Sequence, residues 1–155
     1  MKKIFVVLVL SVISSIGAYA GTGDMALAVK FDYASKYSQP GLGFEYQLSV
    51  VDNVRLAPEF NYYFKNDGVS TWDMNFNVQY VIYPFSSFSI YPFAGFSYTS
   101  WDYDYADNVN KAGANIGCGA EYRISPKVSF ITEERFLLIS DRNQSITSFG
   151  LKFRF

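Results

Sequence analysis

The residues of this sequence that come nearest to a catalytic arrangement are carboxylates. Glu133 and Glu134 are adjacent, and a pair of carboxylates can act as general acid and general base. Adjacent residues of a strand point to opposite faces, however, so these two side chains cannot act on one substrate. The chain contains no histidine, so the usual base for activating a serine is missing. We therefore expect no catalytic site and do not expect an enzyme.

A second acidic group, Asp102, Asp104 and Asp107, supplies oxygen atoms of the kind that bind calcium. The segment lacks the glycine and the distal glutamate of a standard calcium loop, and the chain has no glycine-rich phosphate-binding motif. We therefore expect neither a metal nor a cofactor. The segment instead has the composition of an exposed loop. The residues assigned to this loop are Trp101, Asp102, Tyr103, Asp104, Tyr105 and Asp107.

Other charged residues recur at alternate positions and balance one another. They comprise six acidic and six basic side chains, so each charge has a potential partner of opposite sign. Charged groups are stable in a protein interior only when they are paired and hydrogen-bonded. If these positions face inward, they form an interior charge network. Its expected members are Lys30, Asp32, Glu45, Arg55, Glu59, Asp73, Glu121, Arg123, Glu133, Arg135, Lys152 and Arg154.

These charged side chains lie in segments where apolar and polar residues alternate with a period of two, the pattern of β-strands. Helical periodicity is hard to find after residue 20, whereas apolar and polar residues alternate in eight segments. In the clearest segment, Trp72, Met74 and Phe76 alternate with Asp73 and Asn75. Segments of about ten residues match tilted transmembrane strands, and an even number of strands suits a closed antiparallel barrel. The expected strands are 27–34, 42–50, 54–64, 72–82, 90–101, 112–123, 128–138 and 146–155.

Two barrels are compatible with these strands, and they place opposite faces inside. A soluble, lipocalin-like barrel would enclose the aromatic side chains, whereas a membrane barrel would turn them outward. The interior of an eight-stranded barrel is only just wide enough for side chains, so the aromatic set would overfill it. Aromatic residues reach 19% and charged residues only 17%, against about 25% charged in soluble domains.

These observations predict an all-β fold, a closed eight-stranded antiparallel up-and-down transmembrane β-barrel. We expect Phe76 to point outward and Asn77 to point inward. Aromatic residues near the strand ends are assigned to the girdles at the membrane interfaces. They are Tyr37, Trp72, Tyr83, Tyr91 and Trp101.

The N-terminal segment has the layout of a secretory signal peptide. Two lysines precede an apolar stretch that ends at Ala20 in a small-residue cleavage site. The stretch is shorter than the roughly 20 residues of a membrane-spanning helix. The sequence therefore predicts a signal peptide over residues 1–20 and one barrel domain over residues 21–155. Cys118 is the only cysteine, so no intramolecular disulfide can form, and the net charge of −1 indicates no nucleic-acid partner.

Several residues depart from the ideal strand pattern. Pro58 and Pro92 each remove a hydrogen-bond donor from the sheet, which predicts a bulge or a position near the rim. Alternation also sends one member of the Glu133 and Glu134 pair outward, and a bulge or a shallow depth would lower the cost. Three glycines of the sixth strand either make room for Arg and Tyr side chains of neighbouring strands or relieve curvature. They are Gly113, Gly117 and Gly119.

The last strand ends in FGLKFRF, in which apolar and polar residues alternate up to the final residue. With the signal peptide and the eight amphipathic strands, this ending resembles the small outer-membrane β-barrel proteins of Gram-negative bacteria, the OmpX/OmpA-like porin superfamily. The resemblance covers all of residues 21–155. It implies a location in the outer membrane of a Gram-negative bacterium, with outer-membrane lipid as a partner.

In that family, a C-terminal aromatic residue in such a strand resembles the signal read by the outer-membrane insertion machinery. The resemblance therefore implies that this machinery is a partner during assembly. The residues that it marks as the assembly signal are Phe149, Leu151, Phe153 and Phe155.

The expected function is a structural or surface-interaction role, with the loops exposed outside and an external partner that the sequence does not identify. One alternative is a narrow pore for small solutes or ions. The charged interior argues against a wide channel, which needs many more strands. The other alternative is a soluble exported barrel that binds an apolar ligand.

Overall fold

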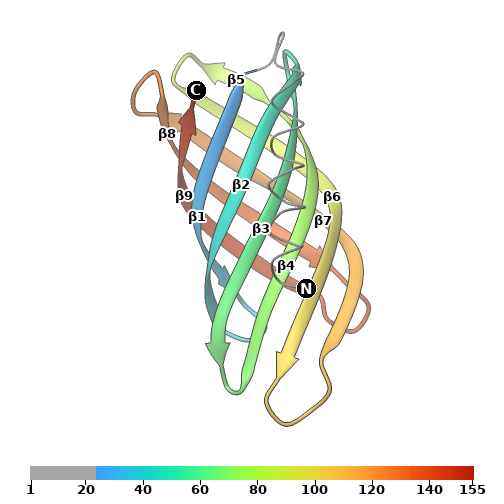
Figure 1. The fold of residues 1–155 in the computed structure, drawn as a ribbon. Helices are drawn as coiled ribbons and strands as arrows, with labels where there is room; N and C mark the ends of the chain where they lie inside the picture. Colours follow the sequence, from blue (N-terminus) through green and yellow to red (C-terminus); the bar gives the residue numbers. More distant parts are fainter. Residues whose placement is uncertain (1–23) are drawn as a thin grey trace.

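The strands of the protein wind round one axis and close on themselves (Figure 1). The computed structural model describes residues 24–155, so the expected signal peptide lies outside the described residues. Among residues 24–155, no helix combines the length and the apolar composition that crossing a membrane requires. The strands are β1 (Met25–Ala34), β2 (Gln39–Val51), β3 (Val54–Asn66), β4 (Val69–Tyr80), β5 (Ile82–Phe85), β6 (Phe88–Tyr103), β7 (Val109–Arg123), β8 (Val128–Leu138) and β9 (Gln144–Arg154).

The barrel has eight strands in effect, because β4 and β5 form one barrel strand with an interruption at Val81. The register of β4 against β6 continues unchanged into the pairing of Ile82 with Ile90. At the interruption, the backbone N–H of Val81 donates to the carbonyl oxygen of Asn53 at 2.7 Å, and the Asn53 side chain donates back to the Val81 carbonyl at 2.8 Å. β1 pairs with β9 and closes the sheet. The predicted fold class is confirmed.

Alternate residues of each strand face the interior and the exterior. Phe76 is 50% exposed and Asn77 is 1% exposed, as expected for an outward aromatic face and an inward polar face. The exposed aromatic side chains are distributed over every barrel strand. The alternative of a soluble barrel with its aromatic residues enclosed is therefore wrong.

Tyr91 and Trp101 do not lie in exterior girdles. Both side chains are fully buried inside the barrel, and the prediction for these two residues is wrong. They belong to β6, where Gly95, Ser97 and Thr99 also face inward. Counting in twos from these small residues places 91 and 101 on the same face, so the sequence did contain a signal for their direction.

The residues that depart from the strand pattern are accommodated without register shifts. Pro58 pairs with Phe76 of β4 and Pro92 pairs with Cys118 of β7, and neither proline has a partner in the ladder on its other side, where the missing N–H would be needed. The register does not shift at either proline, so the expected bulges are absent. The ladders of β8 are also continuous, and Glu134 points outward from the middle of the strand rather than from a bulge.

The glycines of β7 make room for large side chains of neighbouring strands. An added Cβ at Gly119 would lie 2.4 Å from the Tyr91 ring, and one at Gly117 would lie 2.5 Å from the ring of Phe93. The first of the two interpretations therefore holds, with Tyr and Phe rings rather than an Arg side chain as the occupants. These pairs of small and large residues fill the narrow interior.

The connections divide between the two ends of the barrel. The turns 35–38, 67–68, 104–108 and 139–143 lie at what we call the loop end, at the bottom of Figure 1. The turns 52–53, 86–87 and 124–127 lie at the opposite end with Phe155, which we call the terminal end. Asp67 and Gly68 both have positive φ angles of 48° and 77°, which suits a tight two-residue hairpin.

Candidate functional site

The centre of the interior is organised around Lys30. Its side chain is 1% exposed, and its ammonium nitrogen lies 3.1 Å from Glu45, 2.7 Å from Glu59 and 2.7 Å from Glu133. These groups come from β1, β2, β3 and β8, so one cation joins four strands. The Tyr91 hydroxyl donates to Glu133 at 2.8 Å. A buried ammonium with three acidic partners has the hydrogen-bond acceptors that replace water.

Arg135 forms a second centre nearer the loop end. Its guanidinium lies 3.3 Å from Asp73 and 3.5 Å from Glu59, and it donates to the Tyr63 hydroxyl at 2.8 Å. Asn61 also donates to Asp73 at 2.7 Å. Because Glu59 contacts both Lys30 and Arg135, the two centres form one network.

Glu121 forms a third centre nearer the terminal end. It accepts from Arg55 at 3.1 Å and also pairs with Lys152 and Arg154. Lys152 donates to Gln47 at 3.1 Å, and Gln47 in turn donates to Glu45. The amide side chain of Gln47 therefore connects the Glu121 centre with the Lys30 centre.

The structure brings together most residues of the expected charge network. All of them are buried except Arg123, which is exposed at the terminal end, and Arg154, which is partly exposed. Asp32 is buried but forms no ion pair among the described residues. Arg123 is a correction to the expected set, because its side chain lies at the rim beside Glu121 rather than in the interior. The charge pattern gave no indication that buried amides and Tyr91 also belong to the network.

A hydrophobic plug crosses the interior at the loop end. The ring of Trp101 is fully buried here, so its assignment to the exposed loop is wrong. The plug consists of Ala34, Tyr63, Val69, Trp101, Leu137, Ile139 and Ile146. Together with the ion pairs, these side chains occupy the axis of the barrel. The arrangement can hold strands together.

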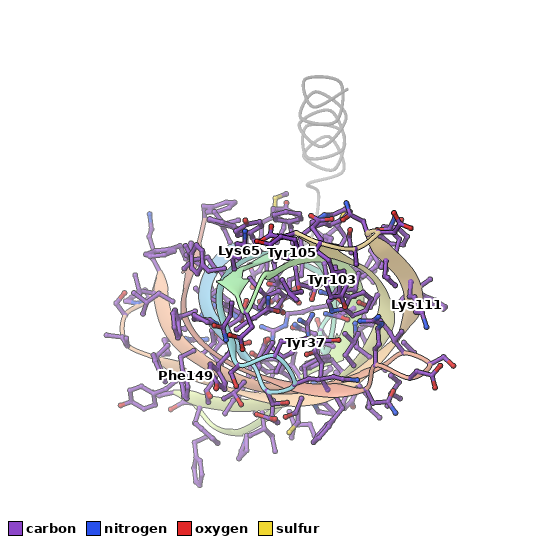
Figure 2. The ribbon with its side chains drawn as sticks, turned by 90° about the horizontal axis from the view of Figure 1, so that it is seen from below. Tyr37, Lys65, Tyr103, Tyr105, Lys111 and Phe149 are labelled. Atoms are coloured by element: carbon purple, nitrogen blue, oxygen red, sulfur yellow. The ribbon has the colours of Figure 1, made fainter. Side chains whose placement is uncertain are left out.

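Arg142 links chain segments next to this plug at the loop end. Its Nη1 donates to the hydroxyl oxygens of Tyr37 at 2.8 Å and Tyr103 at 2.6 Å, and its guanidinium stacks 4.9 Å from the centre of the Trp101 ring. The hydrogen bond to Tyr103 raises the pKa of Arg142. In Figure 2, which looks into the loop end, Tyr37 and Tyr103 lie within the ring of strands. One cation thus joins the loops that contain Tyr37 and Arg142 to the end of β6 at Tyr103.

The loop between β6 and β7 borders a concavity of about 430 Å³ at the same end. Tyr105 is 99% exposed, Asp104 and Asp107 are exposed, and Asp102 and Tyr103 are partly exposed. The lining residues are Lys65, Asp67, Gly68, Tyr103, Asp104, Tyr105 and Ala106. An ion pair between Lys65 of β3 and Asp104 of the β6–β7 loop joins the two sides of the concavity. Within residues 24–155, no cluster of three or more His, Cys, Asp or Glu side chains is placed to hold a metal ion.

The residues expected to form an assembly signal lie in one exterior row. Phe149, Leu151 and Phe153 face outward from β9, beside β1, and Phe155 is exposed at the terminal end. The backbone N–H of Phe155 donates to the Met25 carbonyl at 3.2 Å, so the row extends to the seam that closes the barrel.

Comparisons with known proteins agree with this architecture. A family model described as "Outer membrane protein beta-barrel domain" matches residues 6–155. The structure is similar to the N-terminal β-barrel domain of Pseudomonas aeruginosa OprF, with 17% identity, a TM-score of 0.74, and coverage of 86% of this chain and 100% of that chain. No curated protein matches the sequence at a significant level.

Two other solved structures have the same fold. Neisserial surface protein A is 14% identical, with a TM-score of 0.63 and coverage of 86% of this chain and 96% of that chain. The Yersinia pestis protein Ail, in a phospholipid bilayer nanodisc, is 12% identical, with a TM-score of 0.62 and coverage of 86% and 100%. At these identities the likeness concerns the fold alone.

The Lys30 centre predicts a large difference between two lysine substitutions. Lys30→Met leaves three buried carboxylates without their shared cation, and removing one partner of a buried ion pair costs about 3–5 kcal/mol. Lys127→Met, at an exposed turn position, should change the free energy of unfolding by less than about 0.5 kcal/mol. Urea unfolding of the protein refolded in detergent micelles measures both.

A variant with fewer buried carboxylates separates the loss of charge from the loss of packing. Lys30→Met combined with Glu45→Gln and Glu133→Gln should recover part of the lost stability, because fewer unpaired charges remain buried. Equal unfolding midpoints for Lys30→Met and Lys127→Met would contradict the central role of Lys30.

Proposed function

Because the chain belongs to the family of outer membrane protein β-barrel domains, we propose that it is a non-conducting barrel that acts through its loop end. The protein is located in the outer membrane, so its aromatic exterior lies against lipid. The proposal assigns it a role in binding at the cell surface and assigns it neither catalysis nor transport.

The observation that carries this proposal is the filling of the barrel. The Lys30 and Arg135 centres take up the polar interior, and the plug around Trp101 covers the loop end. An ion crossing the barrel would have to break buried pairs and displace packed side chains. This arrangement supports a closed barrel and argues against the narrow pore.

The loop end supports a binding role at the outside. In barrels of this class the turns on the periplasmic side are short and the outer loops are longer, and we assign the loop end to the outside on that pattern. The concavity beside Tyr105 presents aromatic and charged groups to solvent. Exposed aromatic side chains are enriched where proteins bind one another. The partner of the loop end is therefore an external surface with polar and apolar groups.

The row ending at Phe155 supports a role in assembly. We propose that the insertion machinery of the outer membrane recognises this row before the barrel closes. The position of the row beside β1, where the first and last strands of the barrel pair, supports this proposal.

Electrical recording tests whether the barrel is closed. We expect the full chain, refolded into a planar lipid bilayer, to show no stable single-channel steps, because ion pairs and the plug occupy its axis. A wide porin in the same bilayer serves as the positive control. Regular steps of one unitary size would contradict the proposal and favour the narrow pore.

Paired substitutions test the loop end. Lys65→Ser with Tyr105→Ser should weaken binding of the protein in liposomes to an array of glycans and extracellular matrix proteins by about tenfold or more, the effect of losing an aromatic anchor. The matched control, Tyr83→Ser with Lys127→Ser, changes the same residue types at the terminal end. Equal binding by the two double variants would contradict a role for the concavity.

Substitution of the last residue tests the assembly signal. Phe155→Ala should lower the amount of folded barrel in the outer membrane of living cells, but leave refolding in detergent unchanged. Heat-modifiable mobility on gels measures folding in both settings. Ile124→Ala, another exposed apolar position at the terminal end, is the control. A similar loss in detergent would indicate a structural role instead.

A further inference from the structure

The exterior of the barrel contains one residue that lipid should exclude. Away from the strand ends, Glu134 is the only Asp, Glu, Lys or Arg that faces outward in the described strands. Its neighbour Glu133 faces inward and pairs with Lys30. An ionisable residue that faces hydrocarbon is costly, and such residues commonly mark functional sites.

From its position in β8, we place Glu134 near the middle of the apolar band. It is the sixth residue after Val128, which places it about 15 Å from the terminal end of β8 for a rise of about 3.3 Å per residue and a tilt near 40°. The apolar band of such barrels is about 25 Å tall. Since β8 has no register shift, the backbone does not carry this side chain toward an interface.

The carboxylate is only partly satisfied within its own chain. The Thr147 hydroxyl donates to Glu134 Oε2 at 2.6 Å and is its one hydrogen-bond donor among residues 24–155. The side chain remains partly exposed, so its other oxygen faces the lipid side. Lipid tails offer neither a donor nor a counter-ion, so a partner is needed to satisfy this group.

The outward residues next to Glu134 on β7 and β8 are small on the side toward the terminal end. Cys118 lies opposite Glu134 on β7, and Ala120 and Thr132 form the next outward pair of the same ladder, whereas toward the loop end the next outward pair is Ile116 with Phe136. The exterior elsewhere carries many large aromatic side chains. Small residues allow the backbones of two membrane proteins to approach closely, and polar groups then hydrogen-bond across the contact.

We propose that this Glu134 face, formed by Glu134, Cys118, Ala120, Thr132 and Thr147, is the contact between two copies of the chain in the membrane. The two Glu134 carboxyl groups hydrogen-bond to each other across a twofold axis. The proposal does not depend on what the loop end binds.

Complementarity of the carboxyl groups favours a second copy over another partner. A protonated carboxyl group both donates and accepts, so two of them satisfy each other without a counter-ion. Away from the strand ends, the outward face of the strands within residues 24–155 has no basic residue that would form an ion pair instead. A twofold axis along the membrane normal places the same residue of both copies at the same depth.

The native cysteine reports on this contact directly. In liposomes that contain the full chain, a lipid-soluble bis-maleimide with a span of about 10 Å should couple two Cys118 thiols and give a covalent dimer on denaturing gels, because a twofold axis at Glu134 leaves the two Cys118 residues on opposite sides of it and too far apart for a direct disulfide. Glu134→Leu should lower the yield of dimer about tenfold, as expected from the loss of an intramembrane hydrogen bond. Glu134→Gln should retain more dimer than Glu134→Leu, because an amide also donates and accepts.

A relocated cysteine provides the matched control. Cys118→Ala combined with Val78→Cys places the thiol on an outward position of β4, away from the Glu134 face, and should give little cross-linking. Heat-modifiable mobility confirms that each variant is folded. Equal cross-linking from the two positions, or a yield unchanged by Glu134→Leu, would overturn the proposal. A cross-linked product whose mass differs from twice that of the chain, when the experiment is repeated in native membranes, would also overturn it.

Discussion

Hydrocarbon offers no hydrogen-bond partner to a backbone amide, and this constraint determines the architecture of the protein. β1 and β9 lie at opposite ends of the described chain, yet they pair continuously from Ala26 opposite Arg154 to Ala34 opposite Ile146. No sheet edge is left open to lipid. Closure also gives every strand one face toward lipid and one toward the axis. The polar residues of the strands must therefore lie inside.

The narrow interior then requires these polar residues to compensate one another. Lys30 of β1 contacts carboxylates on β3 and β8, and Arg55 of β3 contacts Glu121 of β7, so the ion pairs join strands that are not neighbours in the sheet. Large rings fill the space that the glycines opposite them leave free, and the plug packs across the interior at the loop end. The interior is consequently a structural element that stabilises the closed barrel.

In the proposed function, interactions with other molecules depend on the outside of the barrel. Two exterior residues depart from the pattern of the rest of the outer surface. Tyr105 exposes an aromatic ring to water, and Glu134 turns a carboxyl group toward lipid. Neither feature contributes to the core, and folded proteins tend to retain such local conflicts at functional sites. The loop end and the Glu134 face are separate surfaces, so contacts at one leave the other free.

Alternation is a local property of a strand, and the sequence alone therefore determined the number of barrel strands, the outward aromatic face and the inward polar face. Within 90–101, apolar residues occupy both faces, and the girdle assignment of Tyr91 and Trp101 was wrong although counting in twos from Gly95 places both inward. The sequence also could not assign three carboxylates to Lys30. Those partners are far apart along the chain, and only closure of the sheet brings their strands around one axis.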